Sequence, residues 1–163
     1  MFKQEALEVL THRRSIRKFK PEQITDEELN AVLTAGTYAP TARGKQSPVI
    51  VAVQNPEERR AVSELNRLVL GGSADPYFGA PTILIVLTPP TELGPLDGAA
   101  VMTNLGNAAS AVGLGSCWVN RPQTMFAMAE GQAMLRRWGL EGEWRGVGSV
   151  ALGYPDIAAP TPA

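Results

Sequence analysis

LDGAAVMTNLGNAASAVGL, residues 96–114, is the segment around which the rest of the chain has to be arranged. It has the length of a helix, it carries small residues on every side, and it has no charged residue after Asp97. A helix without a polar face has to be buried all round. Because a chain of 163 residues can seldom enclose a whole helix by itself, a second copy of the chain could supply the missing cover.

Patterns typical of strands and helices alternate on both sides of this segment. Residues 82–88, TILIVLT, are apolar and partly β-branched, which is typical of a strand buried on both faces. Thr25 and Glu28 form a capping box that predicts a helix start, and Asn55 before Pro56 predicts another. The other predicted strands are 48–54, 115–120 and 146–154, and the other predicted helices are 4–11 and 122–138. We therefore expect an α+β fold with a small central sheet, mixed or antiparallel, flanked by helices.

The composition is that of one ordinary globular domain, with 44% hydrophobic and 19% charged residues. We expect this domain to span residues 1–157, and the proline-containing residues 158–163 to form a flexible tail. The net charge of −1 argues against nucleic-acid binding. The amino end lacks the apolar run of a signal peptide, and no stretch is long enough to span a membrane. With a single cysteine, which permits no intrachain disulfide, these features predict a cytoplasmic protein.

Residues 12–20 read HRRSIRKFK, and six of these nine residues can carry a positive charge. No acidic residue interrupts the run, although acids and bases nearly balance in the whole chain, at 16 and 15. Guanidinium groups are planar bidentate donors that never deprotonate, and a serine hydroxyl adds a neutral donor. The run therefore suits a dianionic phosphate. A solvated basic loop or a weak nucleic-acid patch is the alternative.

Several familiar sites are excluded. No G-x-G-x-x-G follows a predicted strand and no G-x-x-x-x-G-K-[ST] is present, so the dinucleotide-binding and phosphate-loop signatures are missing. One histidine and one cysteine cannot make a typical zinc site. We therefore predict no metal site and no acid–base dyad.

Four segments, in this order, resemble the FMN-dependent nitroreductase family over nearly the whole chain. The basic segment 13–19, RRSIRKF, is similar to the family's amino-terminal signature, and residues 38–47, YAPTARGKQS, are similar to its loop after the second helix. Residues 104–121, NLGNAASAVGLGSCWVNR, resemble the central helix and following strand, and residues 148–155, GSVALGYP, resemble the closing strand. The chain looks like a short member that lacks the usual carboxy-terminal extension.

The resemblance implies a nitroreductase-like homodimer, with the long central helix at the dimer interface and two FMN sites between the subunits. It implies a ping-pong reaction, in which NADH or NADPH gives a hydride to flavin N5 and the flavin then reduces an organic acceptor such as a nitroaromatic compound or a quinone. The flavin carries the chemistry, so no catalytic side chain is expected. By position, the phosphate and ribityl chain would be bound by Arg13, Arg14, Ser15 and Arg17. The partner subunit would contribute Pro40, Thr41, Ala42, Gly44 and Gln46, and backbone N–H groups near the ring would come from Asn120 and Arg121.

The chain departs from the family pattern in two places. Gly44 stands where the family usually has asparagine, and the chain ends nine residues after Tyr154 without a further basic residue. Arg43 and Lys45 are candidates to supply the missing charge. These departures motivate a second hypothesis, a non-catalytic protein of the same fold that binds flavin or another phosphorylated ligand as a sensor. A third is a flavin-dependent oxidase or dehydrogenase of a specialised metabolite.

Overall fold

The computed structural model describes residues 4–161 and contains a four-stranded antiparallel sheet with the strand order β1-β2-β4-β3. The predicted α+β class is confirmed, and the sheet is antiparallel rather than mixed. One isolated parallel bridge, from Ser15 to Ser116, adds to its β3 edge. The strands are β1 (Val49–Val53), β2 (Thr82–Thr88), β3 (Gly115–Val119) and β4 (Arg145–Gly153).

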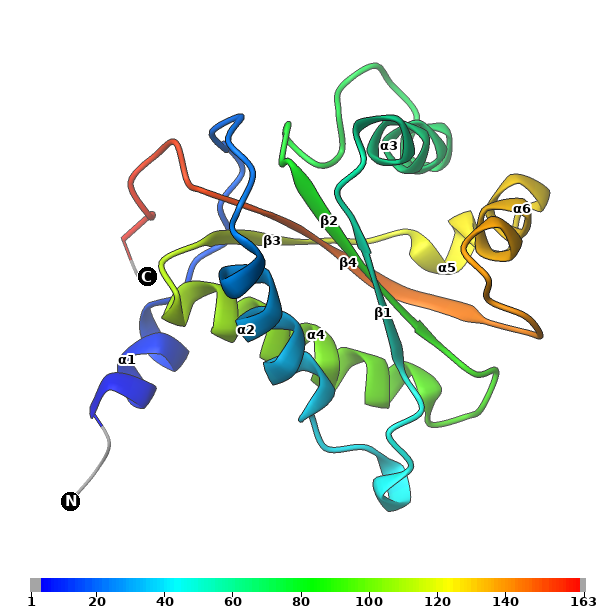
Figure 1. Cartoon of the computed structure of the whole chain (residues 1–163), viewed down its shortest axis with the longest axis horizontal. Helices are drawn as coiled ribbons and strands as arrows, with labels where there is room; N and C mark the ends of the chain where they lie inside the picture. Colours follow the sequence, from blue (N-terminus) through cyan, green and yellow to red (C-terminus); the bar gives the residue numbers. More distant parts are fainter. Residues whose placement is uncertain (1–3, 162–163) are drawn as a thin grey trace.

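Helices cover both faces of this sheet (Figure 1). One core lies between the sheet and α2 with α4, and the other lies between the sheet and α3 with α5 and α6. Successive residues of β2 point into opposite cores: Ile83 and Ile85 enter one, and Leu84 and Val86 enter the other. All seven residues of β2 are buried, so the prediction of a strand covered on both faces is confirmed. The helices are α1 (Gln4–His12), α2 (Asp26–Thr37), α3 (Pro56–Leu70), α4 (Gly94–Ala111), α5 (Pro122–Met125) and α6 (Ala129–Arg137), with a 3-10 turn η1 (Ala42–Gly44).

The predicted helix starts are confirmed by their caps. The Thr25 hydroxyl accepts from the Glu28 N–H at 3.2 Å, and the Glu28 carboxylate accepts from the Thr25 N–H at 2.8 Å. The Asn55 side chain accepts from the N–H groups of Glu57 and Glu58. Both patterns satisfy donors that a helix start would otherwise leave unpaired.

The prediction of one helix over residues 122–138 is wrong, because the chain breaks between α5 and α6. Met128 is extended, with φ −78° and ψ 156°. Gly131 packs so closely on the turn before it that a Cβ there would lie 2.0 Å from the Met125 carbonyl oxygen. At this break both Met125 and Phe126 are buried in the core.

Within one protomer, α4 is covered on one face only, and the expected cover of its other face by a second copy of the chain stays a prediction. Its face toward the sheet and α2 is buried, and the Asn104 amide donates to the Ala35 carbonyl of α2 at 2.9 Å. Its outward face is open: Leu96 is 67% exposed, and Thr103 is also exposed. One four-stranded sheet and one neighbouring helix cannot surround a helix of 18 residues.

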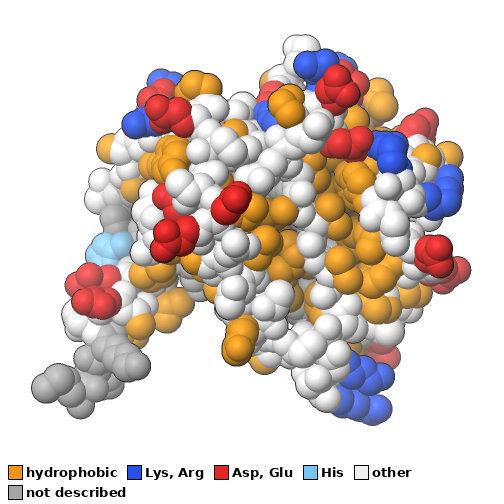
Figure 2. Space-filling view, in the orientation of Figure 1, with side chains coloured by type: hydrophobic (Ala, Val, Ile, Leu, Met, Phe, Trp, Pro, Cys, Tyr) orange, Lys and Arg blue, Asp and Glu red, His pale blue; other side chains and the backbone are white. Residues whose placement is uncertain are grey.

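Charged and hydrophobic side chains occupy different parts of the surface. Figure 2 shows charged side chains around the rim of the viewed face and hydrophobic side chains across its middle, where the edge strand β1 runs. Residues 158–161 are exposed and have no regular structure, and residues 162–163 of the predicted tail lie outside the described part of the chain. The domain boundary at residue 157 stays a prediction.

Asp75 anchors the loop between α3 and β2. Its carboxylate accepts hydrogen bonds from Ser63 Oγ, Arg59 Nη2 and the N–H groups of Tyr77 and Gly79, at 2.6–3.0 Å. Burial by itself would raise the pKa of this carboxyl, but the four donors outweigh it and lower the pKa to about 2. The charged form is therefore the one that the fold stabilises.

Asp75→Asn is expected to lower the free energy of unfolding at neutral pH by roughly 1–2 kcal/mol, since the carboxylate is about a third exposed and screened. Because the folded pKa is depressed, the contribution is complete above the ordinary aspartate value of 3.8 and is lost as pH falls through about 2. Urea unfolding of both proteins at neutral pH and near pH 2 measures this difference. An equal difference at the two pH values would contradict the assignment.

Candidate functional site

The basic segment lies against the free edge of β3. After α1 the chain runs beside this strand, where Ser15 pairs with Ser116 and the Ile16 N–H donates to the Ser116 carbonyl at 2.9 Å. Ile16 is buried, which fixes the alternation of the segment. Arg13 and Ser15 thereby lie beside α4.

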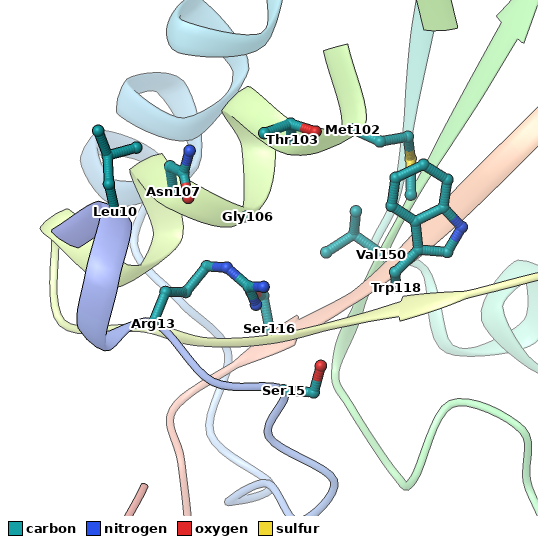
Figure 3. Close-up of a pocket in the computed structure, with 10 residues that line it drawn as sticks. All are labelled: Leu10, Arg13, Ser15, Met102, Thr103, Gly106, Asn107, Ser116, Trp118 and Val150. Carbon is teal, nitrogen blue, oxygen red and sulfur yellow. The ribbon is translucent and has the colours of Figure 1, made fainter. Parts of the chain in front are cut away.

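A cavity of about 310 Å³ lies between this segment, β3 and α4 (Figure 3). Arg13, Ser15 and Ser116 lie toward one end of it, and the Trp118 indole lies at the other end with Met102 and Val150. The cavity therefore has a polar, positively charged end and an apolar, aromatic end. Its lining residues are Leu10, Arg13, Ser15, Met102, Thr103, Gly106, Asn107, Ser116, Trp118 and Val150.

Arg13 is the only charged residue in that lining. The side chain is half-buried and crosses α4 at Gly106, where its Cδ would lie 3.6 Å from a Cβ. Within residues 4–161, Arg13 has no carboxylate partner, because the ion pairs there are Lys18–Asp156, Arg59–Asp75 and Arg137–Glu58. A half-buried guanidinium without an acid is suited to binding an anion from outside the chain.

A second cavity, of about 190 Å³, lies on the other side of Arg13. It shares Arg13 and Ser116 with the first and adds His12 and Arg14. Arg14 folds back on the backbone, donating to the Thr11 carbonyl at 3.2 Å and to the Arg13 carbonyl at 2.7 Å. Arg17 is exposed and lines neither cavity. The structure therefore brings Arg13, Arg14 and Ser15 together and leaves Arg17 outside.

The predicted loop of residues 40–46 lies elsewhere, at the amino end of α4. The Ala42 N–H donates to Asp97 Oδ1 at 2.8 Å, while Arg13 crosses α4 at Gly106. Gly106 follows Asp97 by nine residues, which separates the two by ~14 Å at about 1.5 Å per residue. One protomer therefore does not unite the loop with the basic segment.

The conformation of this loop depends on Gln46. Its amide donates to the carbonyls of Thr37 and Ala39, and its N–H donates to the Thr41 hydroxyl at 2.9 Å. Arg43, Gly44 and Gln46 all have positive φ, at 56°, 62° and 47°. Pro40 and Gly44 are exposed, and Thr41 and Ala42 are half-buried. Because the side chain of Gln46 forms its hydrogen bonds within the loop, it fixes the backbone conformation of the loop.

Asn120 and Arg121 form the turn between β3 and α5. Asn120 is exposed, in line with Ser116 and Trp118 on alternate positions of the strand. Arg121 turns inward, and its Nε donates to Asn66 Oδ1 of α3 at 2.9 Å. Its φ is +87°, in the left-handed region that favours glycine.

Comparison with known proteins identifies the family of this chain. The model of the nitroreductase family matches residues 10–75. A protein of Archaeoglobus fulgidus named "Putative NADH dehydrogenase/NAD(P)H nitroreductase" is 30% identical over an alignment of 135 residues that covers 78% of this chain and 75% of that protein. The chain belongs to the nitroreductase family. The family predicted from the four sequence segments is thus confirmed.

Solved nitroreductases have the same fold. The Bacteroides fragilis nitroreductase with bound FMN is 29% identical, with a TM-score of 0.88 over 98% of this chain and 92% of that one. The Desulfitobacterium hafniense nitroreductase with bound FMN has the same TM-score over 100% and 95% of the two chains, at 23% identity. Both alignments run through the cavity-forming elements of this nitroreductase-family chain, since they cover nearly all of it.

Of the ten residues that line this nitroreductase-family cavity, only Arg13 and Ser15 were predicted from the sequence as cofactor-binding residues. Ser116, Met102 and Trp118 are among the lining residues that the sequence did not predict. Cys117 is buried, but Trp118 is 46% exposed. Its indole rests on Gly148 of β4, where a Cβ would lie 2.8 Å from Trp118 Nε1. The available signal was the alternation of β3, which puts residues 116, 118 and 120 on the side opposite to Cys117 and Val119.

Within residues 4–161, no group of three or more His, Cys, Asp and Glu side chains is arranged to hold a metal ion. In the same described part of the chain, no helix combines the length and hydropathy needed to cross a bilayer.

Proposed function

We propose that this protein is an FMN-dependent oxidoreductase that takes a hydride from NADH or NADPH and passes it to an organic acceptor, such as a nitroaromatic compound or a quinone. The observation that carries the proposal is the half-buried, acid-free guanidinium of Arg13 at one end of a cavity that ends in an indole. Relatives in the same family are named as NAD(P)H nitroreductase and FMN reductase, and the B. fragilis relative contains FMN.

The cavity residues fit FMN in chemistry and order. FMN is flat, apolar on its faces and dianionic at one end, so it needs cationic donors at one end of its site and apolar contacts at the other. Arg13, Ser15 and Ser116 supply donors at one end, and Trp118 and Met102 supply apolar surface at the other. Asn107 and Thr103 add polar side chains on the α4 wall.

In this proposal, Arg13, Arg14 and Ser15 hold the phosphate and the ribityl chain of FMN, and Arg17 lies at the outer edge of the phosphate site. The loop containing Pro40, Thr41, Ala42, Gly44 and Gln46 comes from a second copy of the chain, because in one protomer it lies too far along α4 to reach Arg13. The turn at Asn120 and Arg121 offers backbone N–H groups to the edge of the ring. A homodimer packed through the outward face of α4 is therefore part of the proposal.

When bound, FMN supplies hydride transfer, accepting from the reduced nicotinamide and passing the hydride to the second substrate. The chain positions the ring and keeps water from its apolar end with Trp118, Met102 and Val150. Hydride transfer requires no acid–base pair from the protein, and the cavity lining contains no carboxylate, histidine or cysteine. A ping-pong order, in which the two substrates use the same place in turn, is part of the proposal.

The test is the visible spectrum of the purified protein, reconstituted with FMN and titrated with NADH and NADPH without oxygen. Flavin bands that appear with the protein and bleach on adding the nicotinamide are expected. A protein that stays colourless and does not bind added FMN would refute the proposal. Flavin that binds but is never reduced would favour the non-catalytic sensor, and oxygen uptake with a metabolite would favour the oxidase.

A further inference from the structure

The turn after β3 has two free N–H groups on a backbone whose carbonyls are all bonded. The Val119 carbonyl accepts from Ser149 Oγ at 3.0 Å, the Asn120 carbonyl from Asn66 Nδ2 at 3.0 Å, and the Arg121 carbonyl from the Met125 N–H at 2.9 Å. Within residues 4–161, the N–H groups of Asn120 and Arg121 have no hydrogen-bond acceptor. Nearly all buried backbone N–H groups in folded proteins have an acceptor. These two N–H groups have none within the protomer, so they are available to water or to a ligand.

A buried chain of polar side chains holds this turn from inside. Asn66, Tyr77 and Ser149 are all 0% exposed. Ser149 has a single hydroxyl proton, which goes to the Val119 carbonyl, so the Tyr77 hydroxyl donates to Ser149 Oγ at 3.0 Å and accepts from Asn66 Nδ2 at 3.1 Å. Burial raises the pKa of Tyr77, which keeps that proton in place. The donor and the acceptor of each hydrogen bond in this chain are therefore fixed.

Asn66 is the member that grips the turn at two consecutive residues. Its Oδ1 accepts from Arg121 Nε and its Nδ2 donates to the Asn120 carbonyl. The orientation of the amide follows from chemistry, because a guanidinium can only donate and a carbonyl can only accept. Arg121, one of the two residues that Asn66 holds, has an unfavourable φ of +87°. A residue with a Cβ adopts this backbone conformation only when its surroundings hold it there.

We propose that Asn66 is a positioning residue, which clamps the Asn120–Arg121 turn so that its two free N–H groups are preorganised for the edge of the flavin ring. This inference rests on the proposed function. The guanidinium of Arg121 tethers the turn to α3, because its Nε is bound to a fully buried amide. A glycine would reach the same φ without strain but would leave the turn free to move.

The test compares Asn66→Ala with Tyr77→Phe. Both variants break the same buried network, but the Tyr77 hydroxyl touches no residue of the turn. Asn66→Ala is expected to raise the Kd for FMN about fivefold or more, the size expected for a lost hydrogen bond, and to shift the midpoint potential of bound FMN. Tyr77→Phe is expected to lower the melting temperature while leaving the Kd within about twofold of the wild type.

Adding Arg121→Gly to Asn66→Ala is expected to recover part of the affinity, because glycine adopts φ +87° without the clamp. If the alanine variant does not fold, Asn66→Asp serves instead, since it keeps the acceptor for Arg121 and loses the donor to the Asn120 carbonyl. It is also expected to weaken FMN binding. Unchanged Kd and potential in the folded Asn66 variant, with normal binding by the wild type, would overturn this inference alone. No FMN binding by the wild type would overturn the proposed function and this inference with it.

Discussion

Arg13→Ala is expected to weaken FMN binding at least about tenfold, the larger of the effects expected among the basic residues. A charged, bidentate hydrogen bond lost from a partly buried site costs roughly 1.5–3 kcal/mol, and 1.4 kcal/mol corresponds to about tenfold in Kd. Arg13 is chosen because it lines both cavities and has no carboxylate partner within residues 4–161. Equilibrium dialysis or flavin fluorescence at one fixed salt concentration gives the Kd.

Lys20→Ala is the matched control, because Lys20 belongs to the same basic run but is exposed and lines neither cavity. It is expected to change the Kd by less than about twofold, as is usual for a surface charge. Arg13→Lys should fall between, since lysine keeps the charge but not the planar fork. Arg17→Ala tests the residue that the sequence places at the cofactor and the structure places outside. Wild-type affinity in Arg13→Ala would mean that the phosphate binds elsewhere.

Leu96→Glu is expected to convert the proposed homodimer to monomers and to abolish FMN binding with it. Leu96 is 67% exposed on the outward face of α4, so the change should cost a monomer almost nothing. In an interface it would bury an unpaired carboxylate at a cost of roughly 3–5 kcal/mol, which raises the dimer Kd by more than about a hundredfold. Sedimentation over a range of protein concentrations measures this, with FMN content determined on the same samples.

The control is Leu68→Glu, a leucine that is 65% exposed on α3, on the other side of the sheet. It should leave both the dimer and the FMN content unchanged. A wild-type protein that stays monomeric at all concentrations would contradict the proposed homodimer. A Leu96→Glu monomer that binds FMN with wild-type affinity would mean that one protomer completes the site without the loop of its partner.

The secondary structure could be predicted where its causes are local. The caps at Thr25 and Asn55 involve residues no more than three positions apart, and the uniform apolar character of residues 82–88 already implies cover on both faces. The break after Phe126 could not be predicted in this way. It comes from the packing of Gly131 against the Met125 carbonyl, a close fit that depends on where the core requires Phe126 to be.

For the candidate site, the sequence by itself determined the chemistry: a cluster of arginines around a serine is suited to phosphate wherever the chain carries it. Only the tertiary structure decided which of these residues face a cavity. Arg13 crosses α4 at Gly106 and lines the cavity, whereas Arg17 lies exposed and outside it. Likewise, the contacts among Asn66, Tyr77, Ser149 and Arg121 join residues 11 to 72 positions apart. The physical reason is that residue type sets what a side chain can bind, whereas its direction and its neighbours follow from strand register and packing between distant segments.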